Sequence, residues 1–576
     1  MDKAIIEKAN KWLHSNIDQE IKDAINSMMN NPDKSDLVDA FYKDLEFGTG
    51  GLRGLIGVGS NRMNKLTVGA ATQGLANYLI KCYPGEQIKV AIAHDSRNKS
   101  DYFAETTATV FSANGIKVYF FKELRPTPEL SFAVRHLGCK SGVVITASHN
   151  PKEYNGYKAY WDDGAQMVSP HDVNVIEEVN SIKDFSLINF DRDESKIEYI
   201  GEEIDTIYLE HITKITLSPE AIQQQKDLKI VYSPIHGTGI TLVPKILKKI
   251  GFENVHVVVE QAEPDGNFPT VVYPNPEEAE ALTLALSDAR KIDADIVMAT
   301  DPDADRVGIA VKNHHGDFQL LNGNQTGVLI VYYLLRLWDE RKKLDGNQFV
   351  VKTIVTTDLI HAIADNYNVT YYNTLTGFKF IAEIIRNLEG KKQFIGGGEE
   401  SYGYMIGDFV RDKDAIASCA VIAEMTAWAK NQSKSLMDVL IEIYEEYGFY
   451  LEKLISIVKK GMSGAEEIEK IMFDLRNNPP SNIAGADLVK IIDYKESTEK
   501  NMLSGEVKTI DYPKSNVLQF FTSDGSKISA RPSGTEPKIK FYFSVNDKLA
   551  HKEDFDKVWD MLNSRIDAII KDLKLN

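Results

Sequence analysis

Three aspartates alternate in residues 301–306, which read Asp-Pro-Asp-Ala-Asp-Arg and follow an apolar run that predicts a strand. A loop at the carboxyl end of a strand is the usual place for a ligand in an α/β sheet. The carboxylates of Asp301, Asp303 and Asp305 would repel one another unless a cation neutralises them, and oxygen ligands completed by water or phosphate favour Mg²⁺. An EF-hand loop is excluded because its glycine and distal glutamate are missing. A solvated acidic loop is the alternative.

Residues 146–151 read Thr-Ala-Ser-His-Asn-Pro and follow a second short apolar run. Ser148 is a candidate nucleophile, and the adjacent His149 is a candidate proton carrier. The Gly-x-Ser-x-Gly elbow of α/β hydrolases is absent, and neighbours in sequence rarely form the hydrogen bond of a hydrolase pair, so a structural turn is the alternative. The Asn-Gly pair at 155–156 predicts a further turn that brings Lys158 within reach.

Two further segments suit an anion and a ligand rich in hydroxyl groups. Residues 531–535 read Arg-Pro-Ser-Gly-Thr, in which the guanidinium, the hydroxyls and the amides around the glycine can all donate to an anion. A turn beside a strand is the alternative there. Residues 396–403 read Gly-Gly-Gly-Glu-Glu-Ser-Tyr-Gly and combine a flexible backbone with acceptors for vicinal hydroxyls. Residues 47–54 are also glycine-rich, but they match neither the phosphate-binding loop nor the dinucleotide-binding loop.

Apolar runs rich in β-branched residues must position these loops. They lie at 88–93, 142–145, 228–232, 294–299 and 349–355. Because these runs alternate with helical patterns, they predict an α/β architecture with mixed or parallel sheets. Three of the runs end in a polar loop before a helix and recur at roughly 120 to 140 residues, a spacing that indicates related domains.

Helical periodicity marks both ends of the chain. Apolar residues near the N-terminus recur at spacings of three to five, which predicts one amphipathic helix that covers the fold. These residues are Ile5, Ala9, Trp12, Ile17, Ile21, Ile25 and Met28. Past residues 447–448 the pattern changes to short strand-like runs and a terminal helix between Phe555 and Leu573. This change predicts a smaller α+β domain.

Composition limits the class of protein. The 576 residues correspond to about four domains at ~150 residues each. With 66 basic and 84 acidic side chains the net charge is −18, so nucleic acid is not an expected partner. Cys82, Cys139 and Cys419 are far apart and predict free thiols in a reducing compartment. The most apolar run, 327–335, is shorter than the ~20 residues that span a bilayer. We therefore expect a cytoplasmic protein without membrane attachment.

Together and in this order, these segments resemble the α-D-phosphohexomutase superfamily over nearly the whole chain. Residues 146–151 are similar to its phosphoserine loop, and residues 301–306 are similar to its metal loop. Residues 398–401 are similar to its sugar-recognition loop, and residues 531–535 are similar to its phosphate-binding loop. The joint occurrence of the loops is far more specific than any one of them.

The resemblance also points to a subgroup. The Glu-Glu-Ser-Tyr-Gly form at 399–403 is similar to glucose- or pentose-directed members, whereas the phosphomannomutase/phosphoglucomutase type carries Gly-Glu-x-Ser-Gly-His. The segments 47–53 and 233–237 resemble those of the long bacterial phosphoglucomutases and the related phosphopentomutases. Glucose phosphates are therefore the first expectation, and mannose or pentose phosphates are the alternatives.

The fold that the resemblance implies is α/β, with four domains around a central cleft: three related mixed α/β sheet domains and a smaller C-terminal α+β domain. We expect 1–205 to hold the N-terminal helix and phosphoserine loop, and 206–320 to hold the metal loop. Residues 321–450 would hold the sugar-recognition loop, and 451–576 the phosphate-binding loop. A rotation of the last domain about a hinge near Gly448 would close the cleft over the substrate.

The resemblance implies a role for individual residues. The catalytic residues would be Ser148, His149, Lys158 and Arg53. One Mg²⁺ ion would be held by Asp301, Asp303, Asp305 and an oxygen of phosphorylated Ser148. The substrate would be bound by Arg306, Thr376, Gly377, Glu399, Ser401, Lys413, Arg531, Ser533, Gly534 and Thr535. His149 and Lys158 are the candidates for proton transfer, and Arg53 would support the phosphoserine.

The implied activity is that of an isomerase which interconverts α-D-glucose 1-phosphate and glucose 6-phosphate. Glucose 1,6-bisphosphate would be the intermediate and activator, and a small sugar phosphate would be the only partner, with either a monomer or a homodimer as the assembly. An alternative from a different class is a Mg²⁺-dependent sugar phosphatase that uses Asp301 as its nucleophile. A third hypothesis is a sugar-phosphate sensor without catalytic activity.

Overall fold

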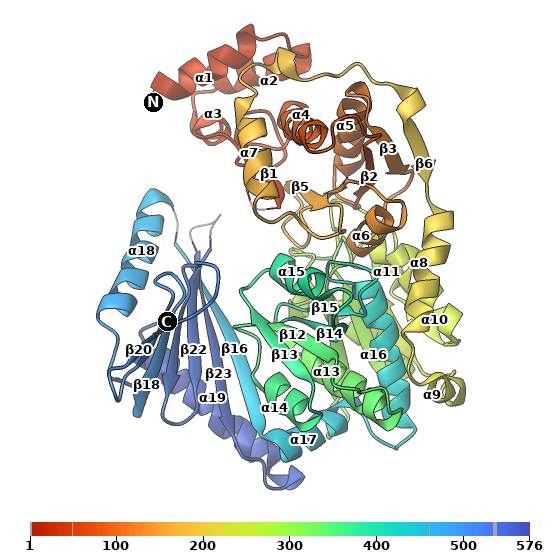
Figure 1. The fold of residues 1–576 in the computed structure, drawn as a ribbon, viewed down its shortest axis with the longest axis vertical. Helices are drawn as coiled ribbons and strands as arrows, with labels where there is room; N and C mark the ends of the chain where they lie inside the picture. The colour runs from red at the N-terminus through yellow and green to blue at the C-terminus, as the bar shows by residue number, and fades with distance from the viewer. Residues whose placement is uncertain (1–2, 49, 460, 534–537, 576) are drawn as a thin grey trace.

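The computed structural model describes residues 3–48, 50–459, 461–533 and 538–575 (Figure 1). The chain forms four sheets in succession, here called the first to fourth sheets. The first three mix parallel and antiparallel pairs with helices around them, and the fourth is antiparallel throughout. The predicted fold class is confirmed, including the distinct C-terminal unit.

All five predicted strands are present, within two residues of their expected ends. The first sheet contains β1 (Gly51–Leu55), β2 (Lys89–His94), β3 (Lys117–Phe121), β4 (Ser141–Ile145), β5 (Tyr154–Trp161) and β6 (Ile197–Ile200). The second contains β7 (Ile230–Ser233), β8 (Val255–Val257), β9 (Ile296–Thr300), β10 (Val307–Lys312) and β11 (Phe318–Leu321). The third contains β12 (Gln348–Thr353), β13 (Thr370–Thr374), β14 (Gln393–Glu399) and β15 (Gly403–Ile406). The fourth contains β16 (Phe449–Val458), β18 (Ala486–Asp493), β19 (Thr498–Asn501), β20 (Val507–Thr509), β21 (Leu518–Thr522), β22 (Lys527–Pro532) and β23 (Lys538–Asp547), with β17 (Asn482–Ile483) beside β18.

The first three sheets repeat one topology. Their central strands run in the orders β3-β2-β4-β5, β8-β7-β9-β10 and β13-β12-β14-β15. In each repeat the first three strands are parallel and the last is an antiparallel return. The predicted relation between the domains is therefore confirmed, because β2, β7 and β12 are the three runs that recur in the sequence.

Helices cover these sheets. Around the first sheet lie α4 (Lys65–Cys82), α5 (Ser100–Ala113), α6 (Thr127–His136) and α7 (His171–Ser181). The second and third units contain α8 (Glu202–Lys214), α9 (Pro219–Gln224), α10 (Val243–Ile250), α11 (Val259–Ala262), α12 (Thr283–Ile292), α13 (Gly323–Glu340), α14 (Leu359–Asn366), α15 (Phe378–Leu388), α16 (Ala415–Lys430) and α17 (Leu436–Tyr447). The fourth unit contains α18 (Gly461–Asn477) and α19 (Phe555–Asp572). In the part of the chain that the structure describes, no helix is both long and apolar enough to cross a membrane.

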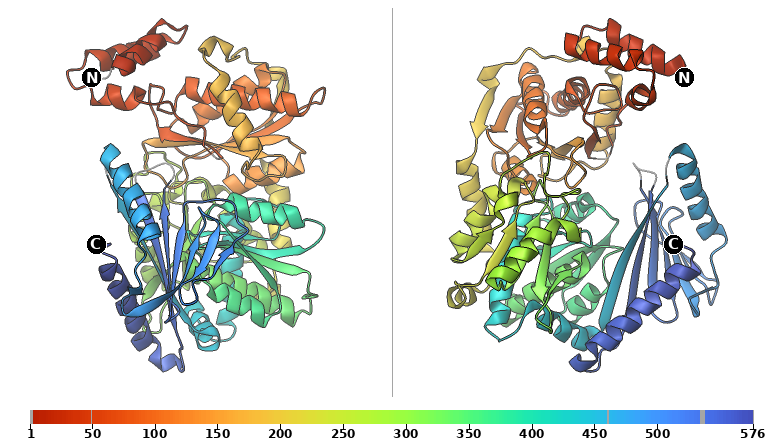
Figure 2. Two further views of the ribbon diagram at one scale, coloured as in Figure 1. Left: turned by 60° about the vertical axis from the view of Figure 1, so that its left-hand side comes forward. Right: turned by 180° about the vertical axis from the view of Figure 1, so that it is seen from behind.

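The prediction of a single N-terminal helix is wrong. The segment forms α1 (Lys3–His14), α2 (Gln19–Asn30) and the further helix α3 (Ser35–Phe41). Trp12 and Ile17 are five residues apart and would lie on different faces of a continuous helix, so the break at Ser15 lets both turn inward. Trp12 and Phe41 pack edge to face with ring centroids 5.5 Å apart. The three helices form their own small core at the edge of the first unit (Figure 2).

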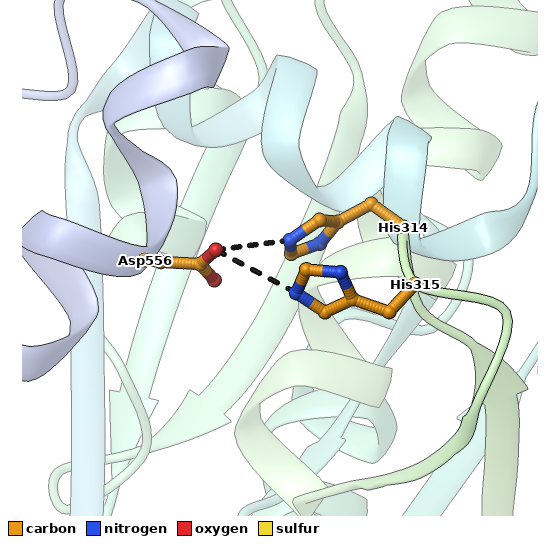
Figure 3. A group of neighbouring side chains, drawn as sticks. All are labelled: His314, His315 and Asp556. Carbon is orange, nitrogen blue, oxygen red and sulfur yellow. Dashed lines mark hydrogen bonds and ion pairs between the residues drawn. The ribbon is translucent and has the colours of Figure 1, made fainter.

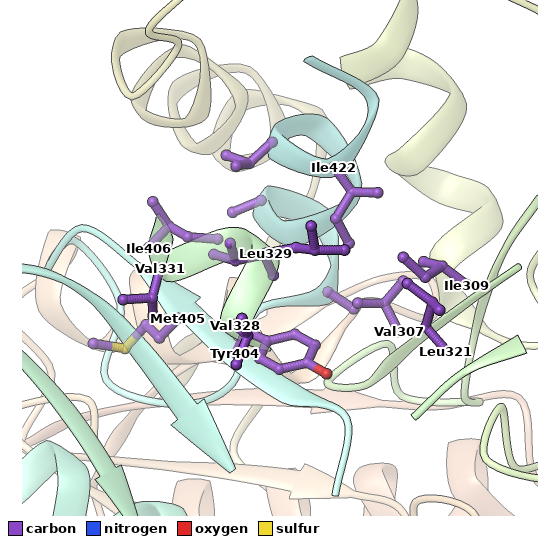
Figure 4. Close-up of a cluster of buried hydrophobic side chains, with 14 of the residues drawn as sticks. Val307, Ile309, Leu321, Val328, Leu329, Val331, Tyr404, Met405, Ile406 and Ile422 are labelled. Carbon is purple, nitrogen blue, oxygen red and sulfur yellow. The ribbon is translucent and has the colours of Figure 1, made fainter. Parts of the chain in front are cut away.

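The second and third units share a core (Figure 4). Buried side chains of β10, such as Val307 and Ile309, belong to the same cluster as Tyr404 and Met405 of β15 and Ile422 of α16. Removal of such side chains from water contributes about 25 cal/mol for each Å² buried. We expect these two units to move together.

The fourth unit joins the same large core where Phe449 of β16 stacks on Tyr444 of α17, with centroids 4.2 Å apart, and it also contacts the third unit through a second, smaller cluster. Val517 and Tyr542 pack there against Ile354 and Leu375, which lie beyond the ends of β12 and β13. Gln519 Nε2 also donates to the carbonyl of Ile354 at 2.9 Å. The fourth sheet therefore rests on the third unit (Figure 2), and the start of α19 also reaches the second unit at His314.

Glu424 links α16 to the start of α9, and it provides a test of this packing. Its carboxylate accepts hydrogen bonds from the amides of Leu217, at 2.6 Å, and Ser218. Burial raises the pKa of Glu424 to about 7, although the two amides act in the opposite direction. Since the folded protein then holds a proton that the unfolded chain releases, stability should fall by up to about 3 kcal/mol between pH ~4.5 and ~7. The thermal midpoint of Glu424→Gln should therefore change less with pH across this range than that of the wild type. If the midpoints of the two proteins changed with pH in parallel, Glu424 could not be the group that titrates.

Candidate active site

The three predicted loops of the first three units follow equivalent strands. Ser148 lies in the loop after β4, Asp301 begins the loop after β9, and Glu399 ends β14. These strands occupy the same position in the repeated topology, and each loop leads into the antiparallel return strand. The repeat therefore gives every unit one loop at the same edge of its sheet, where ligands bind in α/β folds.

A cleft of about 920 Å³ lies between these loops and the fourth sheet. Predicted site residues that line it are Arg53, His149, Arg306, Thr376, Gly377, Glu399, Ser401, Arg531 and Ser533. Ser148, Lys158, Lys413 and the three aspartates are buried beside this group and connect to it through the contacts below. Gly534 and Thr535 lie outside the described residues.

The carboxylates of Asp301, Asp303 and Asp305 converge in the buried wall of the cleft. Their oxygens lie within 4.8 Å of one another. Oδ1 of Asp303 and Oδ1 of Asp305 are buried and have no hydrogen-bond partner among the described residues. Burial, and then the two neighbouring carboxylates, raise the pKa of Asp301 well above its usual value. Unsatisfied carboxylate oxygens with mutual repulsion fit a hard divalent cation such as Mg²⁺.

Two lysines contact this cluster. Lys158 Nζ lies 2.6 Å from Asp303 Oδ2 and 2.9 Å from Asp305 Oδ2, and Lys413 Nζ lies 3.2 Å from the latter atom. Burial would lower the pKa of Lys158, but the carboxylates of Asp303 and Asp305 outweigh burial and raise it. Lys158 is therefore a cation that balances the cluster.

The turn that we expected at residues 155–156 is not present there, because the chain turns earlier, at 152–153. Residues 155 and 156 belong to β5, which pairs with β1 and β4. A Cβ on Gly156 would lie only 2.5 Å from the carbonyl oxygen of Thr146, so glycine permits close packing of the strand against the serine loop. Lys158 reaches the aspartates from the strand itself.

Ser148 combines an unusual backbone with two side-chain contacts. Its φ of 54° lies in the left-handed region. Its hydroxyl donates to Asp301 Oδ2 at 2.9 Å, and it also lies 3.1 Å from His149 Nδ1. Neighbours in sequence rarely make such a side-chain contact, and here the sharp turn at Ser148 brings the two side chains together. Burial, and then the charges of Arg306 and Arg53, lower the pKa of His149 well below its usual value.

Arg97, which sequence reasoning did not single out, holds the serine loop. The buried guanidinium lies 3.3 Å from Asp95 and donates to four carbonyl oxygens at distances between 2.5 and 3.1 Å. These carbonyls belong to Ser148, Asn150, Pro151 and Tyr154. One planar cation thus fixes both ends of the loop that presents Ser148. The only signal in the sequence is an arginine in the polar loop after β2.

We predict that Arg97→Met destabilises the protein by about 3–5 kcal/mol, because it leaves Asp95 as a buried charge without its partner. Arg97→Lys keeps the charge but loses the fork that reaches several carbonyls, so it should lower kcat while it preserves more of the stability. Thermal unfolding and steady-state kinetics of both variants measure the two effects. Full activity in Arg97→Met would show that the serine loop does not need this support.

We expect a flexible backbone at residues 396–403 from the sequence, but most of this segment is strand. Gly396 to Gly398 belong to the buried strand β14, and a Cβ on Gly397 would lie 2.0 Å from the carbonyl oxygen of Val351. The glycines thus permit close strand packing, and only 400–402 form a turn. Glu399 Oε1 accepts a hydrogen bond of 2.7 Å from the amide of Gly377. This contact places two predicted sugar-binding residues side by side.

The fourth sheet contributes cations from two adjacent strands. Arg531 of β22 pairs in register with Lys540 of β23, and both residues line the cleft. Lys540, another residue that sequence reasoning missed, has its pKa lowered by burial. Ser533 accompanies them, its amide donating to the carbonyl of Lys538 at 2.8 Å. Cationic and hydroxyl donors on one wall suit a phosphate group.

Two arginines complete the opposite wall. Arg53 on β1 reaches the loop of Ser148 through Asn150 Oδ1, at 3.5 Å. Arg306 Nη1 donates to Glu277 Oε1 at 2.7 Å, so Glu277 fixes the guanidinium within the cleft lining. The cleft therefore places several cations where a phosphate can bind, with glutamates between them, in a chain whose net charge is −18.

Three segments of the chain match successive domains of one known protein family. Residues 44–185 match the family description "Phosphoglucomutase/phosphomannomutase, alpha/beta/alpha domain I", and residues 206–316 and 322–447 match domains II and III of the same family. The chain belongs to the phosphoglucomutase/phosphomannomutase family. A relative named phosphoglucomutase from Staphylococcus haemolyticus is 39% identical over 507 residues, which cover 88% of this chain and 91% of the relative. One from Staphylococcus aureus is 38% identical over 531 residues, which cover 92% and 93%.

The fold of this phosphoglucomutase/phosphomannomutase family member is also found in solved structures. A family protein from Burkholderia thailandensis has a TM-score of 0.65 at 20% identity and covers 92% of this chain and 97% of its own. Paramecium parafusin, a phosphoglucomutase described in an open form, has a TM-score of 0.66 at 17% identity and covers 92% and 95%. The resemblance to the phosphohexomutases is confirmed, and the chain is an enzyme of that class. The domain boundaries near residues 205, 320 and 450, the cytoplasmic location and the oligomeric state remain predictions.

Proposed function

We propose that this enzyme is a phosphoglucomutase, which interconverts α-D-glucose 1-phosphate and glucose 6-phosphate through a phosphoserine at Ser148. The staphylococcal relatives that carry this name match about nine tenths of the chain. The observation that carries the proposal is the contact of the Ser148 hydroxyl with Asp301, 2.9 Å, in a carboxylate cluster beside the cleft. A nucleophile, a cation site and a phosphate-binding wall are the parts that phosphoryl transfer needs.

The first transfer moves the phosphoryl group from Ser148 to the sugar. The bond between phosphorus and Ser148 Oγ breaks, a bond from phosphorus to the attacking sugar oxygen forms, and glucose 1,6-bisphosphate results. The hydroxyl proton leaves and Ser148 Oγ takes up a proton in return; His149 and Lys158 are the candidates for these transfers, the lysine entering as a cation that can donate a proton and the imidazole as a neutral group that can accept one. A bound Mg²⁺ ion, which Asp301, Asp303 and Asp305 would hold with a phosphoryl oxygen, would polarise the phosphoryl group and offset its charge.

The second transfer uses the bisphosphate in the reverse orientation and returns its other phosphoryl group to Ser148. Arg531 and Ser533 would bind whichever phosphate is not transferred, with Lys540 beside them. Glu399 and Ser401 would hydrogen-bond hydroxyl groups that lie similarly in both orientations. Arg53 and Arg306, on the wall near Ser148, would support the phosphate in transfer. Thr376, Gly377 and Lys413 would complete the surroundings of the sugar.

A kinetic panel tests the choice of sugar. Values of kcat/KM are compared for the 1-phosphates of glucose, mannose, N-acetylglucosamine and ribose, each with its bisphosphate supplied as activator. We expect glucose to exceed mannose by more than about tenfold, a discrimination that one well-placed hydroxyl contact can supply. A preference for mannose or ribose would overturn the proposed substrate, and release of free phosphate without isomerisation would favour the phosphatase.

Closure of the cleft is a further prediction. Gly448, with a φ of 100°, is the single residue between the end of α17 and the start of β16, so the chain enters the fourth unit through a residue with unusual backbone freedom. We expect glucose 1-phosphate to reduce the radius of gyration of a Ser148→Ala variant, which binds the sugar but cannot turn it over. Small-angle X-ray scattering with and without the ligand measures the change. Identical scattering curves at saturating ligand would exclude the rotation.

A further inference from the structure

A second group of metal-ligating side chains lies outside the cleft (Figure 3). His314 and His315 stand in the turn between β10 and β11, and Asp556 lies at the start of α19. The histidines belong to the second unit, and Asp556 belongs to the fourth. None of the three lines the cleft, and the proposed phosphoryl transfer uses none of them.

Both imidazoles point at one carboxylate oxygen. His314 Nε2 lies 3.1 Å from Asp556 Oδ2, and His315 Nε2 lies 3.7 Å from the same atom. The three donor atoms all lie within 4.8 Å of one another. The first contact has the length of a hydrogen bond, whereas 3.7 Å is too long for one. The ring of His315 also packs against that of His314, with centroids 3.9 Å apart, so both imidazoles face the same carboxylate.

These distances suit a shared metal ion. In a four-coordinate site with bonds of about 2.0–2.1 Å, neighbouring donor atoms lie roughly 3.3 Å apart, so small rotations of these exposed side chains bring them into place. Two imidazoles and one carboxylate are ligands that Zn²⁺ accepts, whereas Mg²⁺ prefers oxygen alone. Because all three residues are exposed, water can occupy the fourth position.

We propose that His314, His315 and Asp556 form a site for a divalent transition-metal ion of the Zn²⁺ class. The ion joins the β10–β11 turn to the start of α19, segments that are 242 residues apart between His314 and Asp556. The site adjoins the connection between the third and fourth units, because Phe555 stacks on Phe449, the first residue of β16, with centroids 5.1 Å apart. Metal binding therefore ties the fourth unit to the second and stabilises the folded chain.

Metal uptake by the full-length protein tests the site. Wild type and His314→Gln/His315→Gln are equilibrated with a small excess of Zn²⁺ in excess Mg²⁺, then desalted, and bound zinc is counted by elemental analysis. Zn²⁺ at the carboxylate cluster of the cleft contributes equally to both proteins, so the difference reports the new site. We expect one more equivalent in wild type. Equal zinc contents would overturn the proposal.

Matched variants make the result specific. His256 and Asp288 form a surface pair of similar length, 3.1 Å, without a second imidazole, so His256→Gln should retain all of the zinc. Asp556→Asn should weaken Zn²⁺ binding by more than about tenfold, because mutation of a residue that only hydrogen-bonds a metal ligand already lowers metal affinity by about that factor. Zn²⁺ should also raise the thermal midpoint of wild type more than that of the double variant. Loss of zinc in His256→Gln, or an equal thermal rise in the double variant, would contradict the site.

Discussion

Replacing Ser148 with alanine is expected to lower kcat for the interconversion of glucose 1- and 6-phosphates by about 10⁴-fold or more, because loss of the nucleophile removes the covalent route. The substitution removes one hydroxyl whose contacts are Asp301 Oδ2 and His149 Nδ1. Neither contact belongs to the packed core, so the variant should fold and should still bind sugar phosphates. Steady-state kinetics, with thermal unfolding as a check of the fold, measure both expectations.

Ser141 provides the matched control for Ser148. It lies at the other end of the same strand, β4, and its buried hydroxyl donates to the carbonyl of Tyr160 at 2.7 Å. Ser141→Ala should cost some stability, about 1 kcal/mol for the lost hydrogen bond, and should keep nearly full activity. If Ser148→Ala retained activity comparable to this control, Ser148 could not be the residue that carries the phosphoryl group.

Removal of the divalent cation is the second change with a large expected effect. The buried oxygens Asp303 Oδ1 and Asp305 Oδ1 lack hydrogen-bond partners among the described residues, and the cluster lies beside the Ser148 hydroxyl. Loss of a cation that stabilises transferring charge costs several kcal/mol, so we expect at least about 10³-fold lower kcat after chelation. Addition of Mg²⁺ should restore the rate, and Asp303→Asn should prevent that restoration. Initial rates across a Mg²⁺ titration measure all three effects.

Asp295 is a suitable control for Asp303. It lies just before β9, at the opposite end of the strand from the metal loop, and pairs with Lys430 at 2.7 Å. Asp295→Asn should respond to chelation and to Mg²⁺ as the wild type does. Activity that persists in rigorously chelated wild-type enzyme would refute the assignment of a cation to the carboxylate cluster.

The sequence predicts the site correctly where one short segment contains both the functional side chains and the strand that positions them. The alternation of Asp301, Asp303 and Asp305 directly after an apolar run predicts a convergent carboxylate loop, and the structure brings their oxygens together. The recurrence of β2, β7 and β12 predicts related units in the same way, because strand periodicity and a polar loop are local features. Roles assigned through the resemblance, such as those of Glu399 and Arg531, stay proposals until the variants are measured.

Sequence reasoning failed where a residue's role depends on distant backbone. Arg97 holds carbonyl groups more than fifty positions further along the chain, and periodicity carries no trace of such contacts. Gly397 and Gly156 were interpreted as flexible or turn-forming, yet each fits a strand whose neighbour leaves no room for a side chain. His314 and Asp556 become neighbours only because the fourth unit packs against the turn of the second.

The most direct test follows the phosphoryl group itself. Purified enzyme is charged with glucose 1,6-bisphosphate labelled in its phosphates, the phosphorylated residue is located by peptide mass spectrometry, and unlabelled glucose 1-phosphate is then added for a single turnover. We predict that the label resides on Ser148 and passes quantitatively to the sugar, with no free phosphate. Label on Asp301, or label released as inorganic phosphate, would contradict the mutase mechanism and indicate a phosphatase instead.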